Sequence, residues 1–440
     1  MKVQRRTGIR ACAAAAIAVA LGIGAAACGS SGGSASSGGK VSIQFWTNDT
    51  NPVEKQIVAA FNASHPDINV QLTAYQTDTY LSALATAATN KSLPDVLFEG
   101  LGDTLAHQYE NAGLIENLTP YADKLGWSKD FTALSIKLLS YKGQWWEEPL
   151  YDLGMGIWYR KDAFSKVHIS PPTTFAEFVS DLAKIKAAGI TPISLGGQDY
   201  WLPMRFFDAL LVYYGGNNFF TQLAERKVPW NSKPVIEAFT TMHNWTTAKY
   251  FTPGFMSINP SDDYVPLFQG SAAMVLEGSW EDATIIGNKQ AVSDYGFFPF
   301  PQDQTPNLLS VFSQGLMIAK NTKHLQAALT FIEYYDSPAN LERFGGELSQ
   351  TFARLGVPAP KDQPGAAEIA SQISSQGGGY LPIDQILPQP LVNSFSTAQA
   401  GDVSGSMTPT QAADSLQSAV KAYTGAWPWG NQPVPGMSGG

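Results

Sequence analysis

The fold is set by residues 41–75, VSIQFWTNDTNPVEKQIVAAFNASHPDINVQLTAY. Apolar and polar side chains alternate from Val41 to Trp46, the pattern of a β-strand, and Pro52 suits the first turn of a helix. A second strand is expected over 68–75, and another helix then leads to a buried strand at 94–99. This alternation of strands and helices is typical of β-α-β units around a parallel sheet.

Later segments continue the α/β pattern. Thr174 and Glu177 form a capping-box pair at the start of a helix that should end at Gly189. Extended segments are expected at 144–150 and 156–159, and a strand is expected at 190–195. Two more helices are expected, one at 323–335 and one from 408 onward.

The N-terminus has the pattern of a secretory leader, because basic residues precede an apolar, alanine-rich run that ends at Ala27. Cys28 then resembles the lipidated cysteine of a bacterial lipobox, although Ala25 stands where such motifs usually carry Leu or Val. We expect a signal peptide at 1–27, and a lipidated cysteine with a flexible Ser/Gly linker at 28–39. The linker would tether the protein to the outer face of the bacterial cytoplasmic membrane. A plain secretory leader with a chance cysteine is the alternative.

Composition excludes several classes of function. Without the four basic residues of the leader, 24 Lys and Arg stand against 37 Asp and Glu, which argues against nucleic acid or anionic lipid heads as partners. Cys12 and Cys28 are the two cysteines of the sequence, so the mature body has no disulfide. Aromatic residues make up 12% of the chain. Most must pack in the core, and the rest are candidates for contact with a hydroxyl-rich ligand.

Four blocks of sequence occur in one order along the body: Glu148–Gly154 with Trp158–Phe164 and Pro171–Phe178, Gly270–Trp280, Phe297–Pro301, and Ser313–Ile318 with the helix at 323–335. Together they resemble the maltose-binding-protein-like class of extracellular solute-binding proteins that serve ATP-driven sugar importers. The resemblance extends over residues 41–424, essentially the whole body.

The resemblance implies an α/β, two-lobed periplasmic-binding-protein-like fold. Each lobe would be a central, mostly parallel sheet flanked by helices, and crossover hinge segments would join the lobes. The block order places lobe 1 at 40–150 plus 300–336, and lobe 2 at 151–299 plus 337–440. Crossovers are expected near 149–155, 299–306 and 336, and the block at 171–174 should touch no ligand.

Ligand contacts in such a fold come from the ends of strands. The candidates for stacking on a sugar are Trp46, Trp201 and Trp280. The candidates for holding hydroxyl groups are Asn48, Asp49, Glu99, Asp103, Tyr151, Asp152, Glu277, Gln314 and Arg354. The alternatives are core or hinge packing for the tryptophans, helix capping for the loop residues, and an ordinary surface position for Arg354.

The implied function is a monomeric, lipid-anchored carbohydrate receptor that closes over a sugar, an oligosaccharide given the aromatic candidates, and docks on the membrane permease of an ABC importer. A polyol, glycerophosphodiester or peptide ligand, or a secreted glycan-degrading enzyme, are the alternatives. No catalysis, metal or cofactor is expected. The histidines are scattered, Glu147 and Glu148 would point to opposite faces of a strand, and the Gly-x-Ser-x-Gly match at 29–33 lies in the linker.

Overall fold

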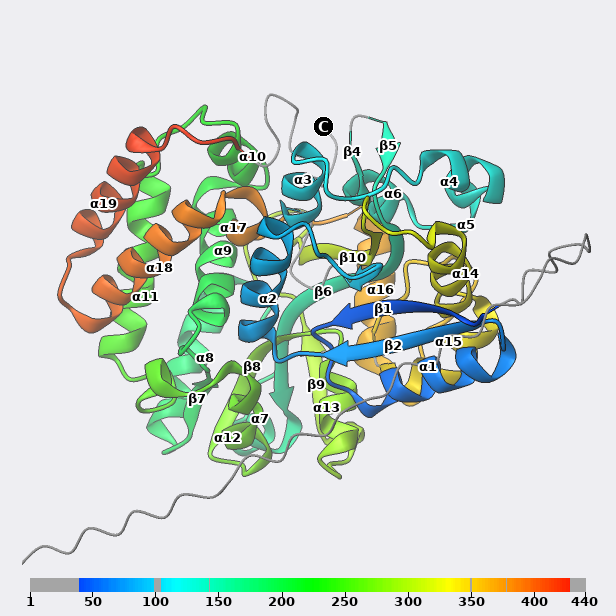
Figure 1. Ribbon diagram of the computed structural model, residues 1–440. Helices are drawn as coiled ribbons and strands as arrows, with labels where there is room; N and C mark the ends of the chain where they lie inside the picture. Colours follow the sequence, from blue (N-terminus) through cyan, green and yellow to red (C-terminus); the bar gives the residue numbers. More distant parts are fainter. Residues whose placement is uncertain (1–38, 99–103, 142, 349, 377, 428–440) are drawn as a thin grey trace, which may run out of the picture. The chain divides into compact units, whose positions relative to one another are not determined.

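A mixed eight-stranded sheet organises the chain, with strand order β2-β1-β3-β10-β6-β8-β7 and β9 paired to β6 (Figure 1). The computed structural model describes residues 39–98, 104–141, 143–348, 350–376 and 378–427. The strands of this sheet are β1 (Val41–Thr47), β2 (Ile68–Ala74), β3 (Val96–Phe98), β6 (Glu148–Arg160), β7 (Thr191–Ser194), β8 (Ala272–Gly278), β9 (Tyr295–Phe298) and β10 (Ser310–Ile318). A separate two-stranded sheet consists of β4 (Ser140–Tyr141) and β5 (Gln144–Trp145).

The first β-α-β unit forms as the sequence predicts. Strands β1 and β2 pair in parallel along their full length, and β1 also pairs in parallel with β3. Helix α1 (Pro52–Ser64) connects β1 to β2, with Pro52 in its first turn and the Asn51 side chain accepting a hydrogen bond from the Val53 amide. The buried side chains of Ile57 and Phe61 fix this helix against the core.

Two central strands connect the two ends of the sheet. The sequence predicted two extended segments joined across 151–154, but β6 is one continuous strand of 13 residues. Its first part pairs with β10, and its second part pairs with β8 and β9. Strand β10 pairs with both β6 and β3, whereas the crossover expected at 299–306 falls between β9 and β10 and contains no strand. That earlier segment carries three prolines, which cannot donate to a strand ladder.

Helices pack around the sheet. In the N-terminal region they are α2 (Thr77–Thr89), α3 (Thr104–Asn111), α4 (Thr119–Leu125), α5 (Trp127–Asp130) and α6 (Ala133–Leu139). In the middle region they are α7 (Lys161–Lys166), α8 (Phe175–Ala187), α9 (Trp201–Gly215), α10 (Phe219–Ala224), α11 (Lys233–Thr247), α12 (Tyr264–Phe268) and α13 (Glu281–Gly287). The remainder are α14 (Leu325–Tyr335), α15 (Pro338–Leu348), α16 (Pro364–Gln376), α17 (Ile383–Ile386), α18 (Gln389–Ser404) and α19 (Pro409–Ala422), besides three short 3₁₀ turns.

Helix α15 differs from the predicted lobe boundary. Residues from 337 onward were expected in lobe 2, but α15 contacts α1 and α14. The Asn51 side chain also donates a hydrogen bond of 2.7 Å to the Glu347 carbonyl. Helices α18 and α19 pack instead with α11. The apolar face of α15, with Leu341 and Phe344, is buried, so packing decides its place.

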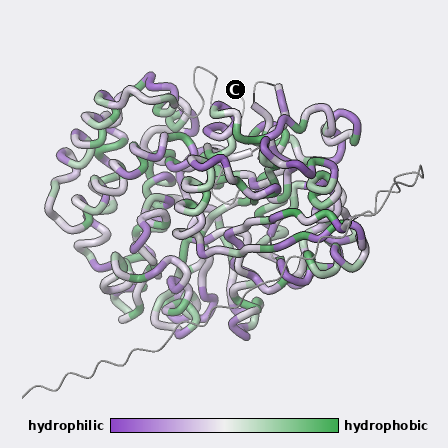
Figure 2. The backbone as a smooth tube through the Cα atoms, in the orientation of Figure 1, coloured by the Kyte–Doolittle hydropathy of each residue, from purple (hydrophilic) through white to green (hydrophobic). Residues whose placement is uncertain are grey.

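Most aromatic side chains belong to the core, as expected from their number. Trp127, Trp158 and Trp230 are almost fully buried. Hydrophobic and hydrophilic stretches alternate along the outer helices, so these present one face to the interior (Figure 2). No helix among the described residues has the length and apolar character needed to cross a membrane.

Candidate functional site

Tyr151 and Gln314 form a directly opposed pair on the central strands β6 and β10. Opposed side chains of an antiparallel ladder share one face, and Phe312 lies on the same face two residues from Gln314. Trp280, which follows β8, contacts Phe312 with ring centroids 6.4 Å apart. Three predicted ligand residues from three separate segments therefore meet on one face of the central strands.

The loop after β1 approaches the same place. The Asn48 Oδ1 atom is buried without a hydrogen-bond partner. Asp49 Oδ1 accepts the Asn51 amide at 2.8 Å, and burial raises the pKa of Asp49. The charge of Asp49 is among the causes that raise the pKa of Tyr151, so this loop lies near the central strand. The charge of Asp49 therefore acts on Tyr151, and a ligand site shared by Asn48, Asp49 and Tyr151 stays a prediction.

Glu54 and Tyr335, which no sequence pattern singled out, act on the buried Tyr151 hydroxyl group. The Tyr335 hydroxyl donates to Glu54 Oε1, and Glu54 Oε2 has no partner. Burial, followed by the charge of Asp49, raises the pKa of Glu54 to about 8. A Glu in the first turn of a helix has the pattern of an ordinary capping residue, so only the contact with Tyr335, 281 positions away, distinguishes it.

The end of β8 brings Glu277 and Trp280 together. The Glu277 carboxylate accepts a hydrogen bond of 3.2 Å from the Gly278 amide. Glu277 is buried, which raises its pKa to about 7, whereas Trp280 is half-buried. Trp280 thus joins the core on one side and keeps part of its surface accessible.

The other two tryptophan candidates have different surroundings. Trp46 is half-buried and packs on Tyr75, with ring centroids 5.2 Å apart. The Trp201 ring lies under the Arg205 guanidinium, 5.8 Å from its centroid. Arg205 itself is buried and paired with Asp384 at 2.6 Å and with a second aspartate of α9. No described contact joins these two rings directly to Trp280.

Asp152 has a structural role, not the ligand contact that the sequence suggested. Its carboxylate accepts hydrogen bonds from three hydroxyl groups, those of Thr132, Ser135 and Ser313. Burial raises its pKa, and these hydroxyl groups lower it. Because both carboxylate oxygens are engaged, Asp152 fixes α6 to β6 and β10.

Arg354 is likewise occupied within the protein. Its Nε donates to Asp336 Oδ2 at 2.6 Å, and its guanidinium lies 3.5 Å from Asp130 and 4.7 Å from the Phe131 ring centroid. The buried Glu148 carboxylate is 4.0 Å away. The guanidinium neutralises buried carboxylates, so we correct the prediction that it contacts ligand. The predicted residues Cys28, Glu99 and Asp103 lie outside the described residues.

Comparison with known proteins identifies the class of this arrangement. A sequence profile of the bacterial extracellular solute-binding proteins matches residues 47–342. The chain belongs to this family. It is a family of binding proteins, and the sequence likewise predicts no catalytic group. Across the described part of the chain, no cluster of three His, Cys, Asp or Glu side chains has the arrangement of a metal site.

Individual relatives of this solute-binding protein are moderately similar in sequence. A "Probable sugar-binding periplasmic protein" of Mesorhizobium japonicum is 27% identical over 62% of this chain and 66% of its own length. A "Multiple sugar-binding protein" of Streptococcus mutans is 25% identical over 77% of this chain and 81% of its own length.

Solved structures confirm the two-lobed α/β fold of this solute-binding protein. A chitin oligosaccharide binding protein superposes with a TM-score of 0.77 at 22% identity, covering 88% of this chain and all of the other. A maltose/maltodextrin-binding domain from Bdellovibrio bacteriovorus, bound to maltotriose, superposes with a TM-score of 0.68 at 18% identity, covering 87% of this chain and 99% of its own. The predicted fold class is therefore right.

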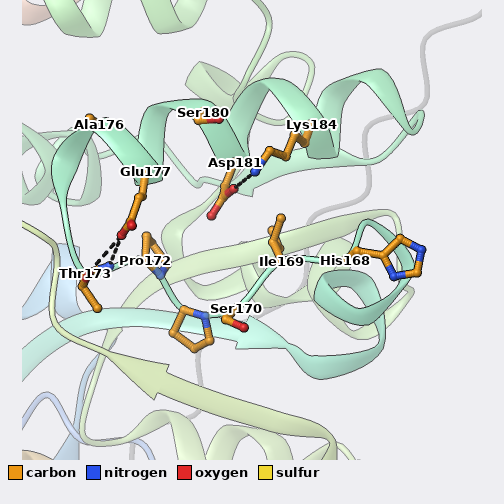
Figure 3. A pocket seen from close by; sticks show the side chains of 11 residues that line it. His168, Ile169, Ser170, Pro172, Thr173, Ala176, Glu177, Ser180, Asp181 and Lys184 are labelled. Carbon is orange, nitrogen blue, oxygen red and sulfur yellow. Dashed lines mark hydrogen bonds and ion pairs between the residues drawn. The ribbon is translucent and has the colours of Figure 1, made fainter.

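A cavity of about 550 Å³ lies elsewhere on the solute-binding protein, between residues 168–173 and helix α8 (Figure 3). Its charged groups are paired with each other or with the backbone. Lys184 contacts Asp181 at 2.9 Å, and Glu177 accepts hydrogen bonds from Thr173. None of the predicted ligand residues lines this cavity.

Proposed function

We propose that the chain is a lipid-anchored extracytoplasmic receptor that binds a carbohydrate, an oligosaccharide by preference, and delivers it to an ABC importer. The observation that carries the proposal is the half-buried Trp280 ring on the face shared by Tyr151 and Gln314. The apolar face of a pyranose stacks on such a ring, while amide and hydroxyl groups beside it hold the sugar hydroxyls.

Unpartnered polar atoms in the loop after β1 and in α1 support a hydroxyl-rich ligand. Asn48 Oδ1 and Glu54 Oε2 are buried acceptors without a partner. A buried polar atom without a hydrogen bond is costly, so a ligand hydroxyl or a water molecule is the natural partner for each. The names of the relatives, which include "sugar-binding", and the raffinose complex of a similarly folded protein point to the same ligand class.

Closure of the two lobes is the proposed mechanism. Asn48 and Asp49 come from the β1 end of the sheet, whereas Glu277 and Trp280 come from the β8 end. A sugar that contacts both pairs of residues binds more tightly when the two lobes are close together. Its binding therefore shifts the population of the protein toward a closed form. The permease would then recognise that form.

The binding test uses a defined panel of maltotriose, raffinose, chitin oligosaccharides and xylo-oligosaccharides. Calorimetry with the full chain should show binding of at least one, and Trp280→Ala should weaken it about 10- to 100-fold through loss of the stacking surface. Trp427→Ala is the control, because Trp427 packs on Tyr423 and Arg226 near the C-terminus. The proposal fails if no sugar binds, or if both variants bind as the wild type does.

Anchoring has a separate test. Cys28→Ser should move the protein from the membrane fraction to the medium, and a protein that stays in the membrane fraction would contradict lipidation of Cys28.

The alternative ligands are a polyol, a glycerophosphodiester or a peptide. Mass spectrometry of the ligand that copurifies with the protein from its native host distinguishes them. A phosphate ligand needs a cationic partner, but Arg205 and Arg354 are already paired with carboxylates. Cleavage of any sugar in the panel would favour an enzyme instead.

A further inference from the structure

Helix α9 carries an aromatic and two charged side chains along one face near its N-terminal end. Trp201, Arg205 and Asp208 stand at positions i, i+4 and i+7, so they follow one another along the helix surface. Trp201 is half-buried, whereas Arg205 is 4% exposed and Asp208 is fully buried. This face therefore leads from an accessible indole ring into the interior of the protein.

Arg205 and Asp208 fix helix α17 beside α9, and the two helices are neighbours in Figure 1. Arg205 Nη1 donates to Asp208 Oδ2 at 3.2 Å, and Nη2 donates to Asp384 Oδ2 at 2.6 Å. The other Asp208 oxygen accepts the amide of Ile383, the first residue of α17, at 3.4 Å. These contacts place Asp384 against the guanidinium that also lies over the Trp201 ring.

Two polar atoms of this cluster have no partner within the described part of the chain. Asp384 Oδ1 and Arg205 Nε are both buried, and neither makes a hydrogen bond there. Nε lies on the same edge of the planar guanidinium as Nη2, which holds the other oxygen of Asp384. One donor and one acceptor are therefore left open at a single ion pair. Buried polar atoms without a hydrogen bond are costly, so this pair is suited to receive a polar group.

A hydroxyl group satisfies both open atoms, because it can accept a hydrogen bond from Arg205 Nε and donate one to Asp384 Oδ1. A ligand carboxylate has no proton to donate, and Asp384 would repel it. The Asp384 side chain keeps 24% of its surface exposed, so the ion pair lies at the edge of the protein and not at its centre. A neutral sugar that stacks on the neighbouring Trp201 ring carries such hydroxyl groups.

The backbone before Trp201 is strained. Tyr200, the N-cap residue of α9, has a φ of 64°, a left-handed conformation that a bulky side chain rarely adopts. The Tyr200 amide donates to the Gly197 carbonyl at 3.2 Å, which holds this turn. Strained conformations persist where the surrounding structure enforces them, and they are frequent at binding sites. Here the strain lies directly beside the stacking ring.

We propose that Trp201, Arg205 and Asp384 form a second sugar subsite, in which Trp201 stacks on a neutral sugar ring, Asp384 accepts one of its hydroxyl groups, and Arg205 positions the other two side chains. The inference rests on the proposed function, which supplies the ligand class. No described contact joins Trp201 to Trp280, so a ligand that stacks on both rings has more than one sugar unit.

Calorimetry compares the wild type with Trp201→Ala and Asp384→Ala, using the panel sugar that binds. Each substitution should weaken binding about tenfold, through loss of the stacking surface in one and of a charged hydrogen-bond acceptor in the other. Trp427→Ala and Asp123→Ala, the latter at an exposed position on α4, are the controls and should bind as the wild type does. Unchanged affinity in either test variant would overturn the inference, and for Asp384 it would mean that a water molecule fills the open pair.

A second measurement separates positioning from a purely structural role of Arg205. Arg205→Lys keeps the charge but loses the flat, forked group that contacts Trp201 and both aspartates. In protein with ¹⁵N-labelled indoles, the Trp201 N–H resonance, assigned with Trp201→Phe, should move in Arg205→Lys before any sugar is added. This variant should also bind sugar more weakly. A resonance that stays in place, or a lower melting temperature with the affinity of the wild type, would overturn the positioning role.

The same variants separate the second subsite from the proposed function. Binding that Trp280→Ala weakens and Trp201→Ala leaves unchanged would refute the subsite and keep the sugar receptor. Binding that Trp201→Ala and Asp384→Ala weaken but Trp280→Ala does not would support the subsite and refute the role of Trp280. Absence of binding of every panel sugar to the wild type would refute both.

Discussion

Replacement of Glu54 by glutamine should change how the stability of the protein depends on pH. The Glu54 carboxyl group is 2% exposed, accepts the Tyr335 hydroxyl at one oxygen and has no partner at the other. Its pKa is raised from 4.5 to about 8, chiefly by burial. The folded state therefore keeps a proton that the unfolded chain releases, and stability falls as pH rises from 4.5 toward 8.

The size of the effect follows from the two pKa values. Between pH 6 and pH 8 the unfolded chain is ionised at this position, whereas the folded protein stays largely protonated until pH approaches 8. At about 1.4 kcal/mol per pH unit, less the part lost near the folded pKa, Glu54 removes about 2 kcal/mol of unfolding free energy over this interval. A glutamine side chain at this position does not titrate and still offers an oxygen to Tyr335, so Glu54→Gln should lack that loss.

Urea denaturation of the wild type and Glu54→Gln at pH 6, 7 and 8 measures this difference. The difference between the unfolding free energies of the variant and the wild type should grow by about 2 kcal/mol, in favour of the variant, from pH 6 to pH 8. Glu342→Gln, on the exposed side of α15, should keep the pH profile of the wild type. Parallel profiles for the wild type and Glu54→Gln would refute the assignment of a buried, protonated Glu54.

Two further predictions concern the central strands. Arg354→Ala should lower the unfolding free energy by about 3 kcal/mol, because it leaves the buried Asp336 carboxylate without its cation, and a loss below about 0.5 kcal/mol would contradict this contact. Gly315→Ala should lower the melting temperature, since the new Cβ would lie 2.5 Å from the Glu148 carbonyl oxygen, beside the register shift between β10 and β6, at a cost of about 2 kcal/mol. Gly346→Ala on α15 meets no atom within 4 Å and should be neutral or stabilising, so equal losses for the two glycine variants would refute the steric argument.

Several local features were predictable because they depend on neighbours in the sequence. The capping box of Thr174 and Glu177 forms as expected, and α8 ends at Ala187, two residues before Gly189. The helix expected at 323–335 is α14, and the strand that precedes Trp280 is β8. In each case the sequence pattern covers a few neighbouring residues. Helix and strand periodicity is a property of such short segments, so it can be recognised without knowledge of the tertiary structure.

The candidate site was predictable only in part. Trp280, Tyr151 and Gln314 were candidates because each lies on or just after a strand in a block that resembles a known family, and their contact with a ligand stays a prediction. Asp152 and Arg354 were assigned to ligand because a charged residue near a strand end is a reasonable candidate. The partners that occupy their side chains come from other parts of the chain, so no local pattern could show this.

Local sequence was sufficient for the α/β alternation, the family and the strand ends that can carry ligand groups, since periodicity, capping and turn residues act between near neighbours. Long-range packing settled which polar side chains are already engaged, such as Asp152 and Arg354, and which are held close together, such as Glu54 and Tyr335. It also placed α15 against α1. The reason is that burial and hydrogen bonding depend on which distant segments pack together, and packing is a property of the whole sheet and its helices.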